Sequence, residues 1–187
     1  MVSYKNMQAS ETQFLKPDTL VGAFDVRPGM LIGDFGCGSG YMSYAAARVV
    51  GPKGHVYAID VQKPVLEQVK REAQAERITN ISIVWSDLEI VGATKIAQDS
   101  LDAAFLVNML FQVRDRLSVF REVFRLLKSG GKLLVVDWKN ENATIGPPGG
   151  QRVDPEELIR IARSAGFSGE SPIAAGQYHF GLVFIKQ

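Results

Sequence analysis

An acid and three alternating glycines stand where an apolar run gives way to a helix-forming segment. The run over residues 31–35 contains Asp34 and leads directly into Gly36, Gly38 and Gly40. Glycine has no Cβ, so this turn can adopt otherwise strained dihedral angles and lets a ligand approach the bare backbone. The first N–H groups of the following helix have no partner inside the helix. The group therefore predicts a site for a polar ligand and indicates a nucleotide-bearing cofactor.

The residue after the last of these glycines limits which cofactor fits. The dinucleotide fingerprint G-x-G-x-x-G has glycine or alanine at its sixth position, where the helix packs closely on the strand. Here that position is Tyr41. A glycine triplet by itself is also compatible with an ordinary tight turn, so the later motifs must decide between these readings.

Two further apolar runs end in acids. The run 55–60 ends at Asp60, whose carboxylate can accept hydrogen bonds from both ribose hydroxyls of an adenosine, as in dinucleotide folds. A solvated carboxylate at a strand end is the alternative. The run 81–85 stops at Ser86 and Asp87. Asp87 is compatible with a ligand contact and equally with the cap of a short segment that follows.

A fourth and a fifth apolar run complete the series. The run from Leu101 passes into a loop at Asn108, and the run that follows Gly130 and Gly131 ends at Asp137. Five such runs separated by helical patterns predict an alternating α/β fold with a parallel sheet. Ligands of open α/β sheets bind outside the carboxyl ends of the strands, so the residues at these ends should converge on one crevice.

Taken in this order, the motifs resemble those of the class I S-adenosylmethionine-dependent methyltransferases, whose first motif is an acid followed by G-x-G-x-G. The resemblance covers nearly the whole chain. It implies a Rossmann-like three-layer sandwich: a mostly parallel seven-stranded sheet with helices on both faces and an antiparallel hairpin at the C-terminal edge. It also implies S-adenosylmethionine as the cofactor and S-adenosylhomocysteine as the product.

The resemblance assigns cofactor roles to particular residues. Asp87 would lie near the exocyclic amine of adenine, and the backbone N–H of Leu88 would face a ring nitrogen. The methyl donor would point toward the loop at Asn108. The full set of expected cofactor-binding residues is Asp34, Gly36, Cys37, Gly38, Gly40, Asp60, Val61, Ser86, Asp87, Leu88 and Asn108.

Methyl transfer from a sulfonium is an in-line displacement on a carbon that is already activated, so the protein must mainly hold donor and acceptor in line. A dedicated base is then dispensable. If the acceptor needs deprotonation, we expect Asp137 to be the first candidate and Asn108 to orient the acceptor. His179 would serve only if the last hairpin folded back over the site. Otherwise His179 and His55 are ordinary strand residues.

Periodicity and punctuation place the remaining elements. Pro17 suits the first turn of an opening helix, and apolar stripes at helical spacing mark later ones. The predicted helices span about 17–25, 40–50, 62–77, 114–128 and 154–165, and the predicted closing strands 171–175 and 176–185.

Composition is that of one domain. A chain of 187 residues with 46% hydrophobic content predicts a single domain over 1–187. The formal net charge of +1 creates no large positive potential that would attract nucleic acid.

No run approaches the roughly 18 apolar residues of a membrane-spanning helix, and we expect a cytoplasmic protein. Cys37 is the only cysteine, which excludes an internal disulfide and a multi-cysteine metal site, and we expect no metal.

The sequence defines the methyl acceptor less well than it defines the cofactor. Two segments outside the shared motifs are candidates for binding it: residues 1–25, including Met7 and Phe14, as a lid, and the loop 140–152, which is also compatible with a plain surface connector. The sequence 108–111, Asn-Met-Leu-Phe, lacks the two prolines typical of enzymes that methylate base amines. The metal-dependent catechol enzymes need a set of carboxylate and amide ligands around the fourth and fifth strands, and Asp137 with the distant Asn140 matches that set poorly. Residues 126–137 and 154–167 most resemble the quinone-biosynthesis and other small-molecule methyltransferases.

Three hypotheses of different classes follow. The first is a methyltransferase acting on a small molecule or, less favoured, on a protein side chain. The second is a nicotinamide-dependent oxidoreductase, against which Tyr41 and the absence of a catalytic domain count. The third is an inactive protein that binds the cofactor and serves as a partner of another enzyme. Composition does not determine the oligomeric state.

Overall fold

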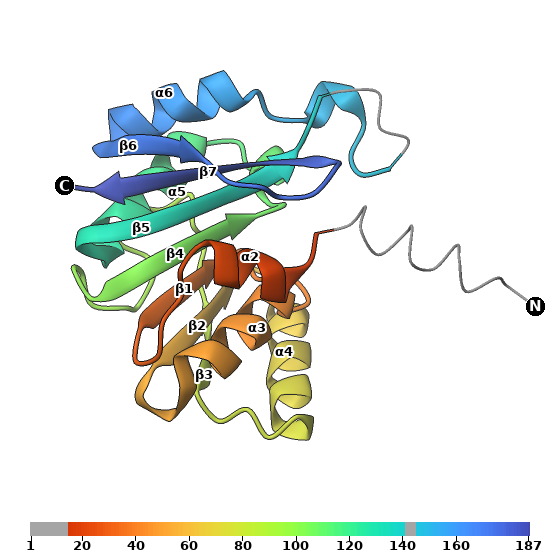
Figure 1. The fold of residues 1–187 in the computed structure, drawn as a ribbon, viewed down its shortest axis with the longest axis vertical. Helices are drawn as coiled ribbons and strands as arrows, with labels where there is room; N and C mark the ends of the chain where they lie inside the picture. The colour runs from red at the N-terminus through yellow and green to blue at the C-terminus, as the bar shows by residue number, and fades with distance from the viewer. Residues whose placement is uncertain (1–14, 141–144) are drawn as a thin grey trace, which may run out of the picture.

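A mixed seven-stranded sheet forms the centre of the molecule (Figure 1). The computed structural model describes residues 15–140 and 145–187, so expectations for Met7, Phe14 and residues 141–144 lie outside the described part. The strands follow the order β3-β2-β1-β4-β5-β7-β6. The order reverses between β1 and β4, and such a reversal in an open α/β sheet is where ligands bind.

Five strands are parallel and two complete an antiparallel edge. The parallel strands are β1 (Leu31–Phe35), β2 (His55–Asp60), β3 (Ile81–Trp85), β4 (Leu101–Val107) and β5 (Leu127–Trp138). The antiparallel strands are β6 (Phe167–Pro172) and β7 (His179–Lys186), with β7 paired between β5 and β6. Central parallel strands are buried on both faces, which explains their continuous apolar runs.

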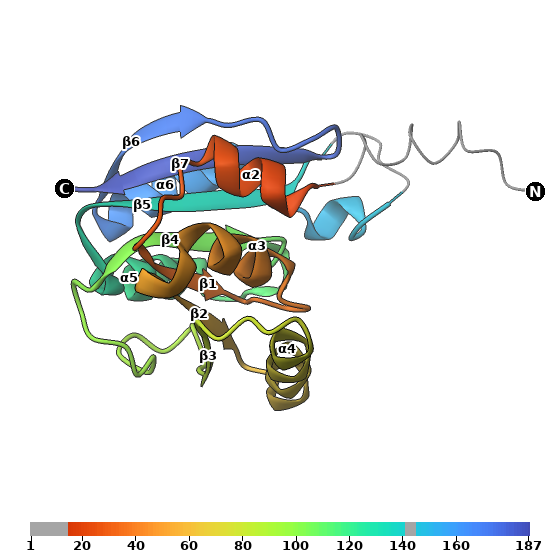
Figure 2. The same ribbon diagram turned by 60° about the horizontal axis from the view of Figure 1, so that its bottom comes forward.

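Helices cover both faces of the sheet (Figure 2). They are α2 (Pro17–Ala23), α3 (Tyr41–Val50), α4 (Lys63–Ala75), α5 (Arg116–Leu126) and α6 (Pro155–Ala165), with the short 3-10 turns η1 (Gly51–Lys53), η2 (Leu110–Gln112) and η3 (Gly149–Gln151). Alternate residues of a strand point to opposite faces. In β5, Leu133 and Val135 accordingly join the core under α5 and α6, whereas Leu134 and Val136 join the core under α2 and α3.

The junction of α5 and β5 differs from the sequence prediction. The helix predicted to reach residue 128 ends at Leu126, and β5 begins at the next residue. Residues 128–131 then form an irregularity inside the strand, because the pairing with β4 jumps from Leu127 to Lys132. Gly130 has a φ of +79° there. The glycine pair therefore lies within an irregular strand, whereas the sequence placed it between the end of the helix and the start of the strand.

The predicted position of the penultimate strand was also wrong. It was expected over 171–175, whereas β6 spans Phe167–Pro172. Phe167 is its one buried side chain, and the register slips between Ser168 and Ser171. A strand with one apolar anchor and an irregular register has no alternating pattern to reveal it. The last strand begins at His179 instead of 176, after a turn in which Gly176 has a φ of +84°.

Candidate active site

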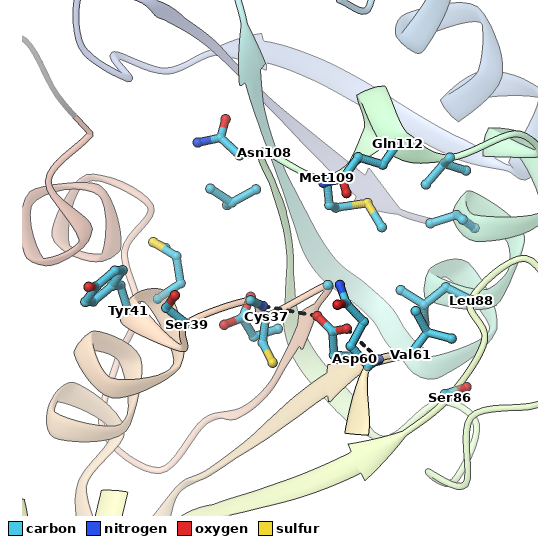
Figure 3. A pocket seen from close by; sticks show the side chains of 18 of the residues that line it. Cys37, Ser39, Tyr41, Asp60, Val61, Ser86, Leu88, Asn108, Met109 and Gln112 are labelled. Atoms are coloured by element: carbon cyan, nitrogen blue, oxygen red, sulfur yellow. Dashed lines mark hydrogen bonds between the residues drawn. The ribbon is translucent and has the colours of Figure 1, made fainter. Parts of the chain in front are cut away.

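A cavity of about 470 Å³ opens at the carboxyl ends of the central parallel strands (Figure 3). Its size lies within the range of about 300–1,000 Å³ that is typical of small-molecule sites. Ten of the eleven expected cofactor-binding residues line it: Asp34, Gly36, Cys37, Gly38, Asp60, Val61, Ser86, Asp87, Leu88 and Asn108. Residues from four different strand ends thus converge on one site. Gly40 and Asp137 are not among the lining residues.

The glycine loop between β1 and α3 needs its glycines for different reasons. Gly36, Gly38 and Gly40 have φ values of +73°, +50° and +79°. A Cβ on Gly36 would stand 3.0 Å from the Met109 side chain, and one on Gly40 would stand 2.9 Å from the Tyr44 ring. A Cβ on Gly38 would meet nothing within 4 Å. Gly40 therefore packs the turn against α3, while Gly38 leaves open space beside the cavity.

Asp34 is buried beneath this loop. Its carboxylate accepts a 2.6 Å hydrogen bond from the hydroxyl of Ser43, which lies in α3. Burial raises the pKa of Asp34 to about 6, and the Ser43 hydrogen bond acts in the opposite direction. Ser43 was not predicted from the sequence, because a serine inside a helix carries no signal of the carboxylate it will meet.

Asp60 is fixed between two backbone segments. One carboxylate oxygen accepts a 3.2 Å hydrogen bond from the N–H of Gly38, and the other accepts a 2.9 Å bond from the N–H of Gln62 (Figure 3). A carboxylate oxygen has more than one lone pair. Both oxygens can therefore accept a further hydrogen bond from a ligand in the cavity.

The wall after β3 combines local capping with exposure to the cavity. Asp87 accepts a 3.0 Å hydrogen bond from the N–H of Glu89, which is the capping contact considered as the alternative for this residue. Asp87 also lines the cavity, so the two interpretations are compatible. The Ser86 hydroxyl is paired with the Thr94 hydroxyl at 2.9 Å. Ser86 therefore anchors the wall, while Leu88 adds an apolar surface.

Asn108 has an unusual conformation at the end of β4. Its φ of +53° is left-handed, which is uncommon for a residue other than glycine. Its backbone N–H donates to the carbonyl of Val136 at 2.8 Å. Its side-chain Oδ1 is buried and has no hydrogen-bond partner within 15–140 and 145–187. Figure 3 shows this side chain and Asp60 on opposite sides of the cavity. A buried, unpaired amide oxygen beside a cavity is a position where a ligand donor fits.

The end of β4 and the turn after it line the cavity mainly with apolar side chains. Met42, Val107 and Val113 line the cavity, and the sequence did not single them out because their pattern is that of ordinary core residues. Met109 of the 108–111 motif lines it too, as does Leu15, which belongs to the segment 1–25 expected as a lid.

The structure does not bring Asp137 into the cavity. It is fully buried, and its carboxylate accepts hydrogen bonds from the N–H groups of Leu110 at 3.2 Å and Trp138 at 2.8 Å. Burial raises the pKa of Asp137 to about 6, which these hydrogen bonds oppose. Its visible contacts hold the η2 turn on the end of β5. This position gives Asp137 no direct contact with a ligand in the cavity.

Both histidines lie in strands, as predicted. His179 opens β7 and is buried against Trp138, with ring centroids 4.2 Å apart. Burial lowers its pKa to about 4, and the charges of Lys139 and Arg152 act in the same direction. His55 lies in β2 and pairs with the Ser82 hydroxyl at 2.9 Å.

The remaining expectations concern Cys37, metals and membranes. Burial raises the pKa of the Cys37 thiol, and the charges of Asp34 and Asp60 raise it further. The raised pKa disfavours the reactive thiolate, so Cys37 is a small residue of the cavity wall. Within the described ranges, no three His, Cys, Asp or Glu side chains gather as a metal site would require. None of the described helices combines the length and apolar content that crossing a bilayer requires.

Known proteins resemble this chain in sequence and structure. The family described as "Methyltransferase domain" matches residues 27–161. The arsenite methyltransferase of Rattus norvegicus is 32% identical over 110 residues, which cover 56% of this chain and 30% of that enzyme. The ubiquinone/menaquinone biosynthesis C-methyltransferase UbiE of Vibrio vulnificus is 31% identical over 113 residues, which cover 60% of this chain and 42% of that enzyme.

A solved structure matches over almost the full chain. It is a SAM-dependent methyltransferase from Aquifex aeolicus with a TM-score of 0.87 and 25% identity, and the match covers 95% of this chain and 93% of that one. The chain spans less than half the length of the two curated enzymes above. The family match nevertheless covers most of the chain, including every strand end that lines the cavity. This chain therefore belongs to the class I S-adenosylmethionine-dependent methyltransferase family.

Proposed function

We propose that the protein transfers the methyl group of S-adenosylmethionine to a small-molecule acceptor by in-line displacement. The observation that carries this proposal is the convergence of the glycine loop, Asp60 and Asn108 on one cavity of about 470 Å³. The glycine loop offers bare backbone and Asp60 offers a carboxylate for hydroxyl groups, and both suit the cofactor, whereas Asn108 offers an unpaired amide oxygen to the acceptor.

Several features of the cavity fit the cofactor. The open space beside Gly38 accommodates a ligand against the backbone. The Asp60 carboxylate is already oriented by two N–H groups and retains lone pairs for the ribose hydroxyls. Asp87 and Leu88 form the wall for the adenine end. These assignments leave the Asn108 side of the cavity for the acceptor.

The chemistry at that side depends on alignment. When bound, S-adenosylmethionine supplies a methyl group activated by a positive sulfonium. A lone pair on the acceptor would form a bond to the methyl carbon while the carbon–sulfur bond breaks, and the electron pair of the broken bond would stay on sulfur. Asn108 would orient the acceptor through its amide oxygen, and the apolar wall at Met109 and Val113 would exclude water.

The proposal gives no proton-transfer role to Asp137. The residues from the end of β4 and the turn after it that line the cavity with Asn108 are apolar or amides: Val107, Met109, Gln112 and Val113. The lining carboxylates Asp34, Asp60, Asp87 and Glu89 belong to the β1, β2 and β3 strand ends on the proposed cofactor side. An acceptor that reaches this site with its nucleophilic lone pair already available therefore fits best.

The apolar wall also favours an organic acceptor. The relatives include both arsenite and quinone methyltransferases by name. Trivalent arsenic is a soft centre that favours thiolates. The cavity contributes one thiol, Cys37, whose raised pKa disfavours the thiolate. A small organic molecule with an apolar body matches Met42, Val107 and Met109 better.

Calorimetric titration tests the cofactor assignment. The purified protein is titrated with S-adenosylmethionine, S-adenosylhomocysteine and NAD, and the titrations are repeated with Asp60→Ala. We expect binding of the first two ligands, a loss of at least about tenfold in the variant, and no binding of NAD. Binding of NAD alone would establish a redox enzyme instead.

An acceptor screen tests the reaction. Phenols, quinols, amines and arsenite are incubated with the protein and S-adenosylmethionine, and S-adenosylhomocysteine formation is measured. Turnover with an apolar organic acceptor is expected. Turnover with arsenite alone would overturn the acceptor assignment, and binding without turnover on any acceptor would favour an inactive partner protein.

A further inference from the structure

The cavity wall after β3 belongs to a segment with no helix of its own. Residues 86–100 connect β3 to β4 through turns and bends. Gly92 in this segment has a φ of +88°. Backbone N–H groups outside regular structure need partners from elsewhere. The conformation of this segment therefore depends on the side chains that meet it.

Glu122 of α5 supplies these partners. Its fully buried carboxylate accepts hydrogen bonds from the N–H groups of Gly92 at 2.7 Å and Thr94 at 3.0 Å. Arg125 donates two more, at 2.9 and 2.8 Å, and a third to the Thr94 carbonyl at 3.1 Å. Burial by itself would raise the pKa of Glu122, but these hydrogen bonds outweigh it and lower the pKa to about 2. The carboxylate is thus a fixed, charged anchor over the whole physiological range.

The anchored segment connects to the cavity through Thr94. Its hydroxyl pairs with the Ser86 hydroxyl at 2.9 Å, and both side chains are buried. The Ser86 N–H donates to the carbonyl of Asp60 at 3.1 Å. Ser86 directly precedes Asp87 and Leu88 and lines the cavity with them. A continuous set of hydrogen bonds therefore runs from α5 to the wall and to the strand end that carries Asp60.

We propose that Glu122 is a positioning residue that sets the cavity wall from Ser86 to Glu89 for the adenosine end of the cofactor. It acts through Thr94 and Ser86 and does not itself line the cavity. The inference rests on the proposed cofactor role of this wall. Hydrogen bonds to a charged group are among the stronger ones, so their loss should move the wall and change affinity.

Two variants test the two links. Glu122→Gln removes the charge and leaves one amide oxygen for the two N–H groups, and Thr94→Val removes the hydroxyl that holds Ser86. Glu170→Gln is the matched control, because Glu170 pairs with Arg163 on the exposed surface at 2.5 Å. Affinity is measured by calorimetry with S-adenosylhomocysteine and with 5′-methylthioadenosine, which has the adenosine end without the amino acid. Circular dichroism fixes a temperature at which every variant is folded.

We expect Glu122→Gln to lower the affinity for both ligands by about tenfold and Thr94→Val to lower it by about threefold, while the control variant binds like wild type. A similar factor for the two ligands assigns the effect to the adenosine end. Variants that are folded, melt at lower temperature and bind both ligands with wild-type affinity would overturn the inference, since Glu122 would then serve only stability. Should Glu122→Gln not fold, Thr94→Val decides by the same two outcomes.

Asp87→Ala separates this inference from the proposed site. One outcome is that Asp87→Ala lowers the affinity for both ligands while Glu122→Gln and Thr94→Val leave it unchanged. In that case the wall binds the cofactor without needing Glu122, and only the inference is overturned. If Asp87→Ala also leaves affinity unchanged, the wall does not hold the adenosine end. Both the proposed cofactor placement and the inference would then be wrong.

Discussion

The Ser43 hydroxyl donates a 2.6 Å hydrogen bond to the Asp34 carboxylate, and both groups are buried. This contact joins the end of β1 to α3 across the glycine loop. Asp34 is held at a pKa of about 6 by burial, so its environment only partly compensates its charge. The hydrogen bond therefore stabilises a carboxylate at the base of the cavity.

Replacing Ser43 tests this contact. Ser43→Ala leaves a buried carboxylate without its hydroxyl partner, so the free energy of unfolding should fall by about 1–3 kcal/mol. Urea denaturation at pH 7.5 measures the change. Ser39→Ala, at an exposed residue of the same loop, is the control and should stay within about 0.5 kcal/mol of wild type. Equal stability of the two variants would contradict the role of the hydrogen bond.

The glycine loop should respond differently at two positions. Gly40→Ala combines a left-handed φ with a Cβ 2.9 Å from the Tyr44 ring, so it should lower the free energy of unfolding by about 2–4 kcal/mol. Gly38→Ala has the left-handed φ but no close contact at its Cβ, so it should lower the free energy of unfolding by about 1–2 kcal/mol. Its added methyl group lies beside the cavity, so cofactor affinity should also fall. Calorimetry and urea denaturation separate the two effects, and a reversed order of stability would contradict the packing argument.

Asn108 should separate stability from catalysis. Asn108→Gly relieves the strain of a side chain at a φ of +53°. This relief offsets the larger conformational entropy that glycine gives the unfolded chain, so the free energy of unfolding should stay within about 1 kcal/mol of wild type. The loss of the amide oxygen should lower kcat/KM for methyl transfer by about tenfold or more. A variant with wild-type kcat/KM would show that the buried oxygen serves no ligand.

The pH dependence of stability should reveal Asp137. Its pKa is about 6 in the folded state and 3.8 in the reference state, so the folded state binds more protons between these values. Its contribution is fully present below pH 3.8 and is lost as the pH rises through 6, by about 2–3 kcal/mol. Asp137→Asn should remove this decrease when unfolding free energies at pH 4.5 and 7.5 are compared. An identical pH difference in wild type and variant would contradict the raised pKa.

His179 should act in the opposite direction over the same range. Its pKa is about 4 in the folded state and 6.5 in the reference state, so the unfolded state binds more protons between these values. Its contribution is present above pH 6.5 and is lost as the pH falls toward 4, by about 2–3 kcal/mol. His179→Phe preserves a ring against Trp138. The free energy of unfolding of the variant minus that of wild type should therefore be larger at pH 4.5 than at pH 7.5. Parallel pH profiles would exclude this contribution.

The sequence around Glu122 itself indicates that this residue is buried. Val119, Val123 and Leu126 form the buried stripe of α5, and Glu122 lies three residues after the first and four before the last. Helical spacing therefore puts it on the same buried face. A charged residue on such a stripe indicates a buried partner, but only the structure shows that the partner is the Gly92–Thr94 backbone.

The sequence by itself determined the parallel strands, the glycine loop and the acids at the strand ends. Continuous apolar runs are required of strands buried on both faces, and parallel strands bring their carboxyl ends to one edge, so Asp34, Asp60 and Asp87 had to meet. Only the tertiary structure decided which side chains face the cavity. Asp137 and Asn108 end neighbouring strands, yet the period of two in β5 turns Asp137 toward the Leu110 backbone, while Asn108 faces the cavity. That choice depends on pairing register, which arises from long-range packing and not from the local residue pattern.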